Sequence, residues 1–87
     1  MYETLILNNG KELSGYFIET ETRLFLYTFG LTLSEAFELF SNPDNIYQIR
    51  MIRNQKESQV EGYNHLYSIS EERGGMICSG LKKVAIA

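Results

Sequence analysis

Histidine and cysteine are the residue types that proteins use most for catalysis and metal binding, and this chain has one of each, His65 and Cys78. A Ser/His/Asp or Cys/His arrangement would need His65 to meet Cys78 or a serine across strands. Neither a nucleophile elbow nor a glycine-rich oxyanion loop accompanies them, and zinc takes three or four ligands. We expect no enzymatic activity, no metal and no cofactor, and interpret His65 as packing beside Tyr63 and Tyr67. The remaining enzymatic alternative is a small hydrolase centred on His65 and Cys78.

Two pairs of glutamates are the other candidates for chemistry. Glu19 and Glu21, like Glu71 and Glu72, are close enough in sequence to share a proton if they met in a pocket. Both pairs fall at predicted turns, where water screens their charges, so a solvated role or contact with Lys and Arg of a partner is the better interpretation. Gly74–Gly75 lacks the spacing and the following helix of a phosphate-binding loop, and we predict a turn there.

Tyrosine is the least ordinary feature of the composition, with six residues in the chain. Its large rigid ring and polar tip are enriched at the centres of interfaces, but strands favour aromatic residues as well. We expect roughly two in three tyrosines to lie in the core and the rest to be available to a partner. The predicted partner-binding residues are Glu19, Glu21, Glu71, Glu72, Tyr16 and Tyr67.

Length and charge limit the class of protein. The 87 residues make one domain, 1–87, because a chain this short cannot divide its core in two. The formal charge of −3 opposes contact with phosphate backbones, so we expect no direct nucleic-acid binding, whereas a basic protein surface is a suitable partner. One cysteine fits a reducing compartment, and no segment reads as a signal peptide or membrane span. We expect a cytoplasmic protein without membrane attachment.

Residues 30–45, GLTLSEAFELFSNPDN, predict one short helix. Thr32 with Glu35 three residues later is a capping box, in which each side chain accepts a hydrogen bond from the other residue's backbone N–H. Pro43 and its polar neighbours stop the helix, which we place at about residues 33–41. The predicted apolar face consists of Leu33, Ala36, Phe37 and Phe40.

Alternating apolar and polar residues predict strands on both sides of this helix. The segments are 2–8, 12–20 and 23–29 before it, and 46–53, 63–69 and about 76–86 after it. Asn9–Gly10 predicts a tight hairpin, Gly80 a bulge, and residues 54–61 an exposed loop. The fold class is α+β, a twisted and mainly antiparallel sheet of about five to six strands with one helix, in the order β-β-β-α-β-β-β.

The short helix raises the question of what covers the sheet. A helix of about nine residues is ~14 Å long, too short for the face of such a sheet. Either the sheet curls on itself or a partner covers the remaining apolar surface. Self-association into a homodimer is one form of the second alternative.

Small proteins encoded in prophages of Gram-positive bacteria resemble this chain in three segments, LNNGKEL at 7–13, LSEAFELFSNPDNI at 33–46 and GYNHL at 62–66. These motifs are structural and transfer no catalytic residue. Many such proteins resemble occupants of tail-assembly gene clusters, and small acidic phage proteins of this build include anti-CRISPR and other anti-defence inhibitors. The resemblance implies a non-catalytic phage or mobile-element protein that binds another protein. Its expected role is that of an anti-CRISPR-like inhibitor occupying the basic nucleic-acid-binding surface of a host defence enzyme, or alternatively of a tail or virion assembly component.

Overall fold

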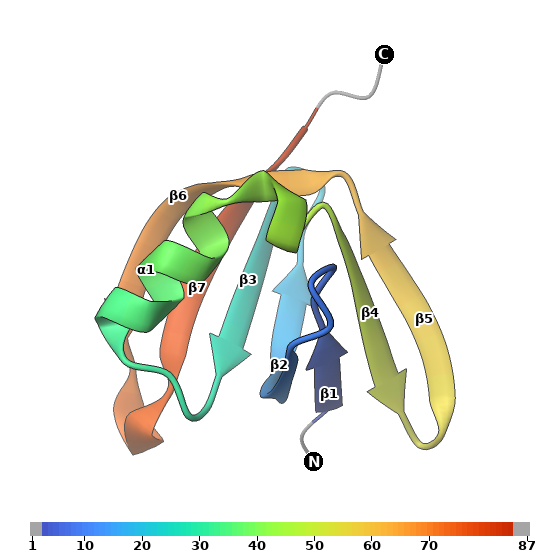
Figure 1. Ribbon diagram of the computed structural model, residues 1–87, viewed down its shortest axis with the longest axis horizontal. Helices are drawn as coiled ribbons and strands as arrows, with labels where there is room; N and C mark the ends of the chain where they lie inside the picture. Colours follow the sequence, from blue (N-terminus) through green and yellow to red (C-terminus); the bar gives the residue numbers. More distant parts are fainter. Residues whose placement is uncertain (1–2, 85–87) are drawn as a thin grey trace.

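One antiparallel sheet of seven strands organises residues 3–84, the part of the chain that the computed structural model describes. Its strand order is β5-β4-β1-β2-β3-β7-β6 (Figure 1). The strands are β1 (Glu3–Ile6), β2 (Glu12–Glu19), β3 (Arg23–Thr28), β4 (Gln48–Arg53), β5 (Lys56–Glu61), β6 (Tyr63–Glu71) and β7 (Ile77–Lys83). The helix α1 (Leu33–Ser41) follows β3, and two 3-10 helices, η1 (Pro43–Asn45) and η2 (Arg73–Gly75), lie in connections. The predicted α+β class with an antiparallel sheet and one α-helix is confirmed. The predicted count of about five to six strands and the order β-β-β-α-β-β-β are not exact, because four strands rather than three follow α1.

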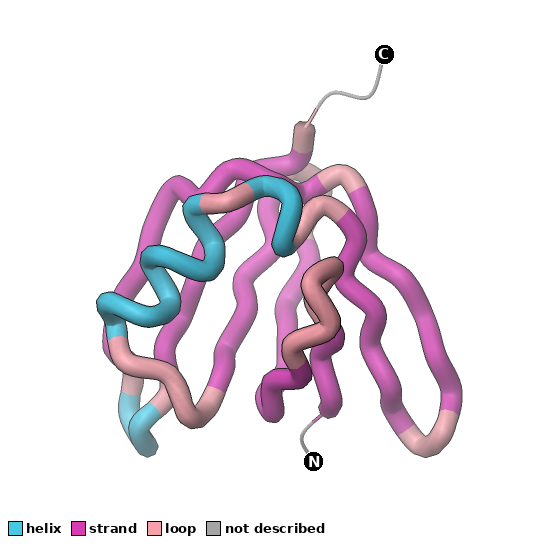
Figure 2. The backbone as a smooth tube through the Cα atoms, in the orientation of Figure 1, coloured by secondary structure: helices cyan, strands magenta, loops and turns pink. Residues whose placement is uncertain are grey.

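The sheet curls strongly (Figure 2). Its edge strands β5 and β6 follow each other in sequence with only Gly62 between them, so the two edges meet at one corner and diverge away from it (Figure 1). Gly62 has a φ of +85°, which glycine adopts without strain, and its N–H donates to the Tyr47 carbonyl at 3.0 Å. The sequence left two alternatives for the apolar surface that the short helix cannot cover, a curled sheet or a partner. On the helix side the sheet curls.

The core lies between the concave side of the sheet and α1. On β3 the buried Leu24 and Leu26 alternate with Phe25 and Tyr27, which are half-buried on the opposite face. We call this opposite face, which α1 does not cover, the outer face. The buried core cluster consists of Leu5, Leu7, Leu13, Leu24, Leu26, Leu31, Ala36, Phe40, Ile46, Ile49, Val60, Tyr63, Ile77 and Leu81.

The bounds of α1 agree with the sequence-based prediction because its start is set locally. The Glu35 N–H donates to Thr32 Oγ1 and the Thr32 N–H donates to Glu35 Oε1, both at 3.1 Å, which completes the capping box. The predicted apolar face is only half buried, however. Two of its members lie in the core, but Leu33 is 38 % exposed and Phe37 is 56 % exposed.

The loop predicted at residues 54–61 is wrong. Residues 56–61 form β5, an edge strand that pairs with β4 from Gln48 opposite Glu61 to Arg53 opposite Lys56. Asn54 and Gln55, with φ of +50° and +65°, make the turn between these strands. Within β5 only one residue, Val60, is buried, so its sequence KESQVE carries almost no apolar signal.

The hairpin predicted at Asn9–Gly10 connects β1 and β2, but it is not tight. Its loop runs from residue 7 to residue 11, with hydrogen bonds from the Leu7 N–H to the Lys11 carbonyl at 3.0 Å and from the Gly10 N–H to the Leu7 carbonyl at 2.9 Å. β1 ends at Ile6, earlier than predicted, and Leu7 at the start of the loop is buried in the core.

The regular alternation predicted for residues 63–69 is also wrong. The register against β7 shifts twice, between Tyr63 and His65 and between Leu66 and Ser68. Tyr63 therefore faces the core, while His65 is exposed and lies opposite Lys82. The bulge expected at Gly80 lies in the facing strand β6 instead. Tyr2 and the predicted strand end at Ile86 are outside the described residues.

Candidate interaction surface

The residues considered for catalysis do not meet in the fold. His65 pairs with Lys82 of β7, whereas Cys78 lies four residues earlier on that strand and pairs with Ser70. Four residues of strand span roughly 13 Å, too far for a hydrogen-bonded pair. Within residues 3–84, no three His, Cys, Asp or Glu side chains gather as a metal site. The same residues contain no helix that is long and apolar enough to cross a membrane.

The outer face carries a cluster of aromatic and aliphatic side chains. The rings of Tyr16 and Tyr27, opposite each other on β2 and β3, stack with centroids 4.7 Å apart. Phe25 of β3 contacts Tyr67 of β6 edge to face, with ring centroids 6.1 Å apart. Ile18 of β2 lies opposite Phe25 in the strand pairing. Ile18 is 49 % exposed and Tyr67 is 38 % exposed. We call these five residues the aromatic cluster.

Tyr67 reaches this cluster because of the irregular register of β6. Gly80 on β7 lies beneath it, and a Cβ at that glycine would be 2.8 Å from the tyrosine ring. The lack of a side chain at Gly80 thus makes room for Tyr67 on the outer face.

Two cations border the aromatic cluster at the end where β3 begins. The guanidinium of Arg23 lies 3.9 Å from the centroid of the Tyr67 ring, and the Lys82 ammonium lies 5.9 Å from it. Both distances suit cation–π attraction. The outer face thus presents two cations at this end, although the chain as a whole is acidic.

A thiol and a phenol interact at the opposite end of the cluster. Cys78 lies opposite Tyr27 in the β3–β7 pairing. A hydrogen bond to Cys78, with burial as the second cause, raises the pKa of Tyr27 to about 12. Burial also raises the pKa of the Cys78 thiol, and the Tyr27 hydroxyl partly offsets this effect. Both groups are therefore neutral at pH 7.

The four predicted partner-binding glutamates are all exposed, but they do not gather in one place. Glu19 and Glu21 lie at the β2–β3 turn, where β3 begins, and Glu71 and Glu72 lie at the β6–β7 turn, near the end of β3. The length of β7, roughly 20 Å, separates the two pairs. They lie at opposite ends of the strands that carry the aromatic cluster.

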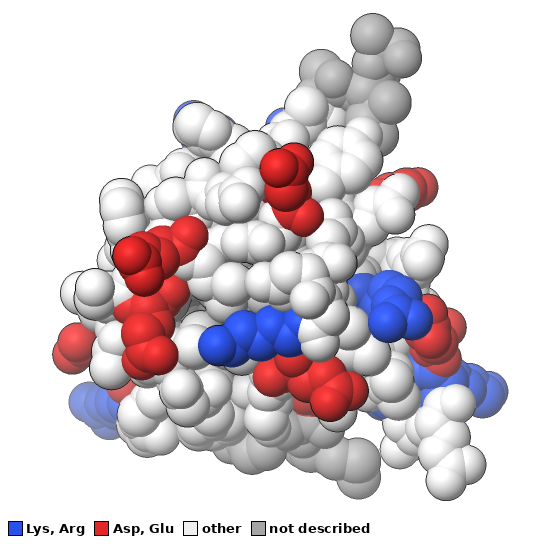
Figure 3. Space-filling model, in the orientation of Figure 1, with Lys and Arg blue, Asp and Glu red and all other residues white. Residues whose placement is uncertain are grey.

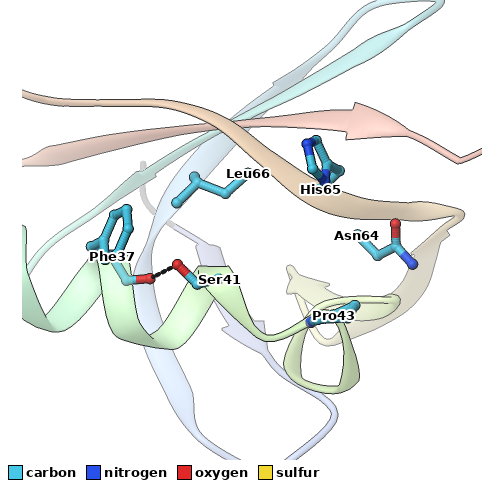
Figure 4. Close-up of a pocket in the computed structure, with 6 residues that line it drawn as sticks. All are labelled: Phe37, Ser41, Pro43, Asn64, His65 and Leu66. Carbon is cyan, nitrogen blue, oxygen red and sulfur yellow. Dashed lines mark hydrogen bonds between the residues drawn. The ribbon is translucent and has the colours of Figure 1, made fainter.

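A second exposed apolar region lies between α1 and β6. Phe37 and Ser41 of α1, Pro43 of η1, and Leu66 of β6 line a groove of about 350 Å³, together with Asn64 and His65 (Figure 4). Leu33, one turn before Phe37, lines a neighbouring hollow with Glu71 and Met76. The helix therefore runs antiparallel to β6, with Phe37 near the level of Leu66.

The two sides of α1 differ in charge. Leu33, Phe37 and Ser41 recur every fourth residue and make an uncharged stripe towards β6. Glu35 and Glu38 line a different hollow, with Lys11 on the other side of the helix. Acidic side chains are gathered over the helix on this face of the molecule (Figure 3).

The two edges of the sheet also differ. Natural proteins protect exposed edges with charged side chains, which discourage pairing with another chain. The edge strand β5, KESQVE, has three charged residues among six, whereas β6, YNHLYSISE, has only Glu71 among nine when His65 is neutral. Next to the uncharged stripe of α1, β6 is the less protected edge.

Sequence reasoning identified part of this surface. It selected Tyr16 and Tyr67, which lie on the outer face, but missed Ile18, Arg23 and Phe37. The apolar character of Phe37 indicated burial, and nothing in the local sequence shows that its helix overhangs an edge. Searches of protein families, curated proteins and solved structures give no match to this chain.

Proposed function

We propose that this protein acts by binding another protein, and that the outer face makes the contact. The observation that carries the proposal is the aromatic cluster, in which Ile18 and Tyr67 expose 49 % and 38 % of their surface on a sheet face that α1 leaves open. Exposed apolar side chains that are contiguous mark interaction sites, and tyrosine is enriched where binding energy concentrates.

The partner we propose is the basic nucleic-acid-binding surface of a host defence enzyme, which the protein would block as an anti-CRISPR-like inhibitor. The net charge of −3 and the acidic turns at both ends of the aromatic cluster support this choice. The cations Arg23 and Lys82 lie at the same end of the cluster as Glu19 and Glu21, so the partner's own surface would need an acidic or aromatic group facing them.

The test is inhibition of DNA cleavage by a purified CRISPR-associated nuclease. Charge reversal of Glu19 and Glu21 to lysine is expected to weaken inhibition by about tenfold or more, and added salt to weaken it further. The matched control reverses Glu38 and Asp44, which are exposed on the helix side, and is expected to change little. Absence of inhibition, or inhibition that neither charge reversal nor salt alters, contradicts the inhibitor role.

A role in tail or virion assembly is the second proposal, and the weakly protected edge β6 favours it. An assembly component docks on a structural protein or on further copies of itself, and an open edge strand suits both. Mass spectrometry of purified particles tests this role. Absence of the protein from particles would rule it out.

A further inference from the structure

We propose that two copies of this chain pair through β6 in an antiparallel, two-fold symmetric dimer, in which α1 of one copy packs against α1 of the other. This inference does not depend on the outer-face proposal, because its central residue, Phe37, lies on the helix side of the sheet and the aromatic cluster lies on the other side. The uncharged stripe of α1 and the nearly uncharged edge β6 are adjacent and form one continuous surface. Burial of that surface would cover Phe37, the most exposed large apolar side chain among the described residues at 56 %.

The charges at the two ends of β6 complement each other in such a pair. Glu71, Glu72 and then Arg73 lie at the end of the strand, whereas its start follows Glu61 and lies opposite Lys82 and Lys83 of β7. A two-fold axis across the edge reverses the second strand, and so brings Glu71 and Glu72 of each copy beside Lys82 and Lys83 of the other, and Arg73 of each copy beside Glu61 of the other. The surface is therefore complementary to a second copy of itself.

The position of Phe37 also suits a two-fold axis. Phe37 is the middle residue of α1, and it shares a groove with Leu66, close to the midpoint of β6. An axis through the middle of β6 would place Phe37 of one copy against Phe37 of the other. The irregular register at Tyr67 interrupts backbone pairing near this point, so the Phe37 contact is expected to contribute most of the affinity.

The spacing of the elements agrees with this arrangement. Because α1 packs on both β6 and β7, its axis lies inside the edge by about half of the 4.8 Å strand spacing. Pairing of two β6 strands would then bring the α1 axes to roughly 10 Å, close to the 8–10 Å at which helices pack. Facing Cα atoms of the two Phe37 residues would be about 5 Å apart, a separation that a disulfide can bridge.

Sedimentation equilibrium over about 1 to 500 µM protein tests the proposal. The expected result is a concentration-dependent rise in mass from one chain to two. Phe37→Lys is expected to raise the dimer dissociation constant at least tenfold, roughly the loss of one central anchor. The matched control is Ile18→Lys. Ile18 is also a large exposed apolar residue, at 49 %, but it lies on the outer face, and its replacement is expected to leave dimerisation unchanged. A monomer at every concentration, or equal effects of both variants, overturns the proposal.

Disulfide trapping gives a second readout that does not depend on affinity. Phe37→Cys is expected to form a covalent dimer under mild oxidation, while Ile18→Cys is expected not to. The buried Cys78 is present in both variants, so its contribution cancels. Equal cross-linking of both variants, or none in Phe37→Cys, contradicts the geometry. The same lysine variants separate the two proposals, because Ile18→Lys should weaken nuclease inhibition and leave the dimer intact.

Discussion

Arg53 is expected to stabilise the fold by compensating a buried charge. Glu3 is only 3 % exposed, and neither of its carboxylate oxygens has a hydrogen bond within the described residues. Its one compensating contact there is an ion pair with Arg53, whose side chain is 61 % exposed. Continuing the β1–β4 register beyond Thr4 and Ile52 places these two residues opposite each other. Arg53 thus neutralises, from the surface, a carboxylate that water hardly reaches.

Arg53→Ala removes that compensation. The free energy of unfolding that the variant loses has an upper limit, and this limit depends on pH. A buried carboxylate without a partner costs about 3–5 kcal/mol, but the group avoids a larger cost by taking up a proton. Protonating a glutamate of ordinary pKa at pH 7 costs about 3.7 kcal/mol, and at pH 5 only about 1 kcal/mol. The variant is therefore expected to lose about 3–4 kcal/mol at pH 7 and about 1 kcal/mol at pH 5, because its native state binds a proton that the unfolded state lacks.

Urea denaturation followed by circular dichroism measures both values, since the chain has no tryptophan. Arg50→Ala is the control: it breaks the Arg50–Glu57 pair, 3.4 Å apart and about half exposed on both sides, and is expected to cost less than about 1 kcal/mol. Replacing Glu3 and Arg53 together with leucine is expected to be nearly neutral. A loss in Arg53→Ala that is no larger than in the control, or that is equal at both pH values, refutes the reasoning.

Four smaller predictions concern single side chains, each measured by urea denaturation. Ser79 is fully buried with no partner for its hydroxyl in the described residues, so Ser79→Ala should not destabilise the fold and is expected to gain up to about 1 kcal/mol; a loss would reveal a missing partner. Thr32→Ala is expected to lose about 1 kcal/mol with the cap, against no loss in Ser34→Ala; equal losses would contradict the capping role. Gly80→Ala should cost about 1–3 kcal/mol, because its Cβ would meet the Tyr67 ring and the hydroxyl of its cross-strand neighbour; a neutral result would show that both move aside. The folded-state pKa of Tyr27 is raised to about 12 from 10.0, so its stabilising contribution is complete below pH 10 and is lost as pH rises towards 12. Between pH 9 and pH 11, Tyr27→Phe should therefore lose less unfolding free energy than the native chain. Parallel profiles of unfolding free energy against pH would argue against the shift.

The sequence by itself determined the features that depend on neighbouring residues. The bounds of α1 follow from Thr32, Glu35 and Pro43, because capping and helix termination act within a few residues. The alternation along β3 likewise follows from its own sequence, since each side chain points to the face opposite its neighbour's. The α+β class and the antiparallel sheet result from such local patterns added along the chain.

Only the tertiary structure decided which polar segment pairs and which apolar residue remains exposed. β5 becomes a strand because β4 supplies its hydrogen bonds, and those form equally well to polar residues. Phe37 is exposed because its helix lies over an edge of the sheet, and Tyr67 reaches the outer face because the register of β6 shifts opposite Gly80. These outcomes depend on contacts between residues far apart in the chain, and periodicity within one segment carries no information about them.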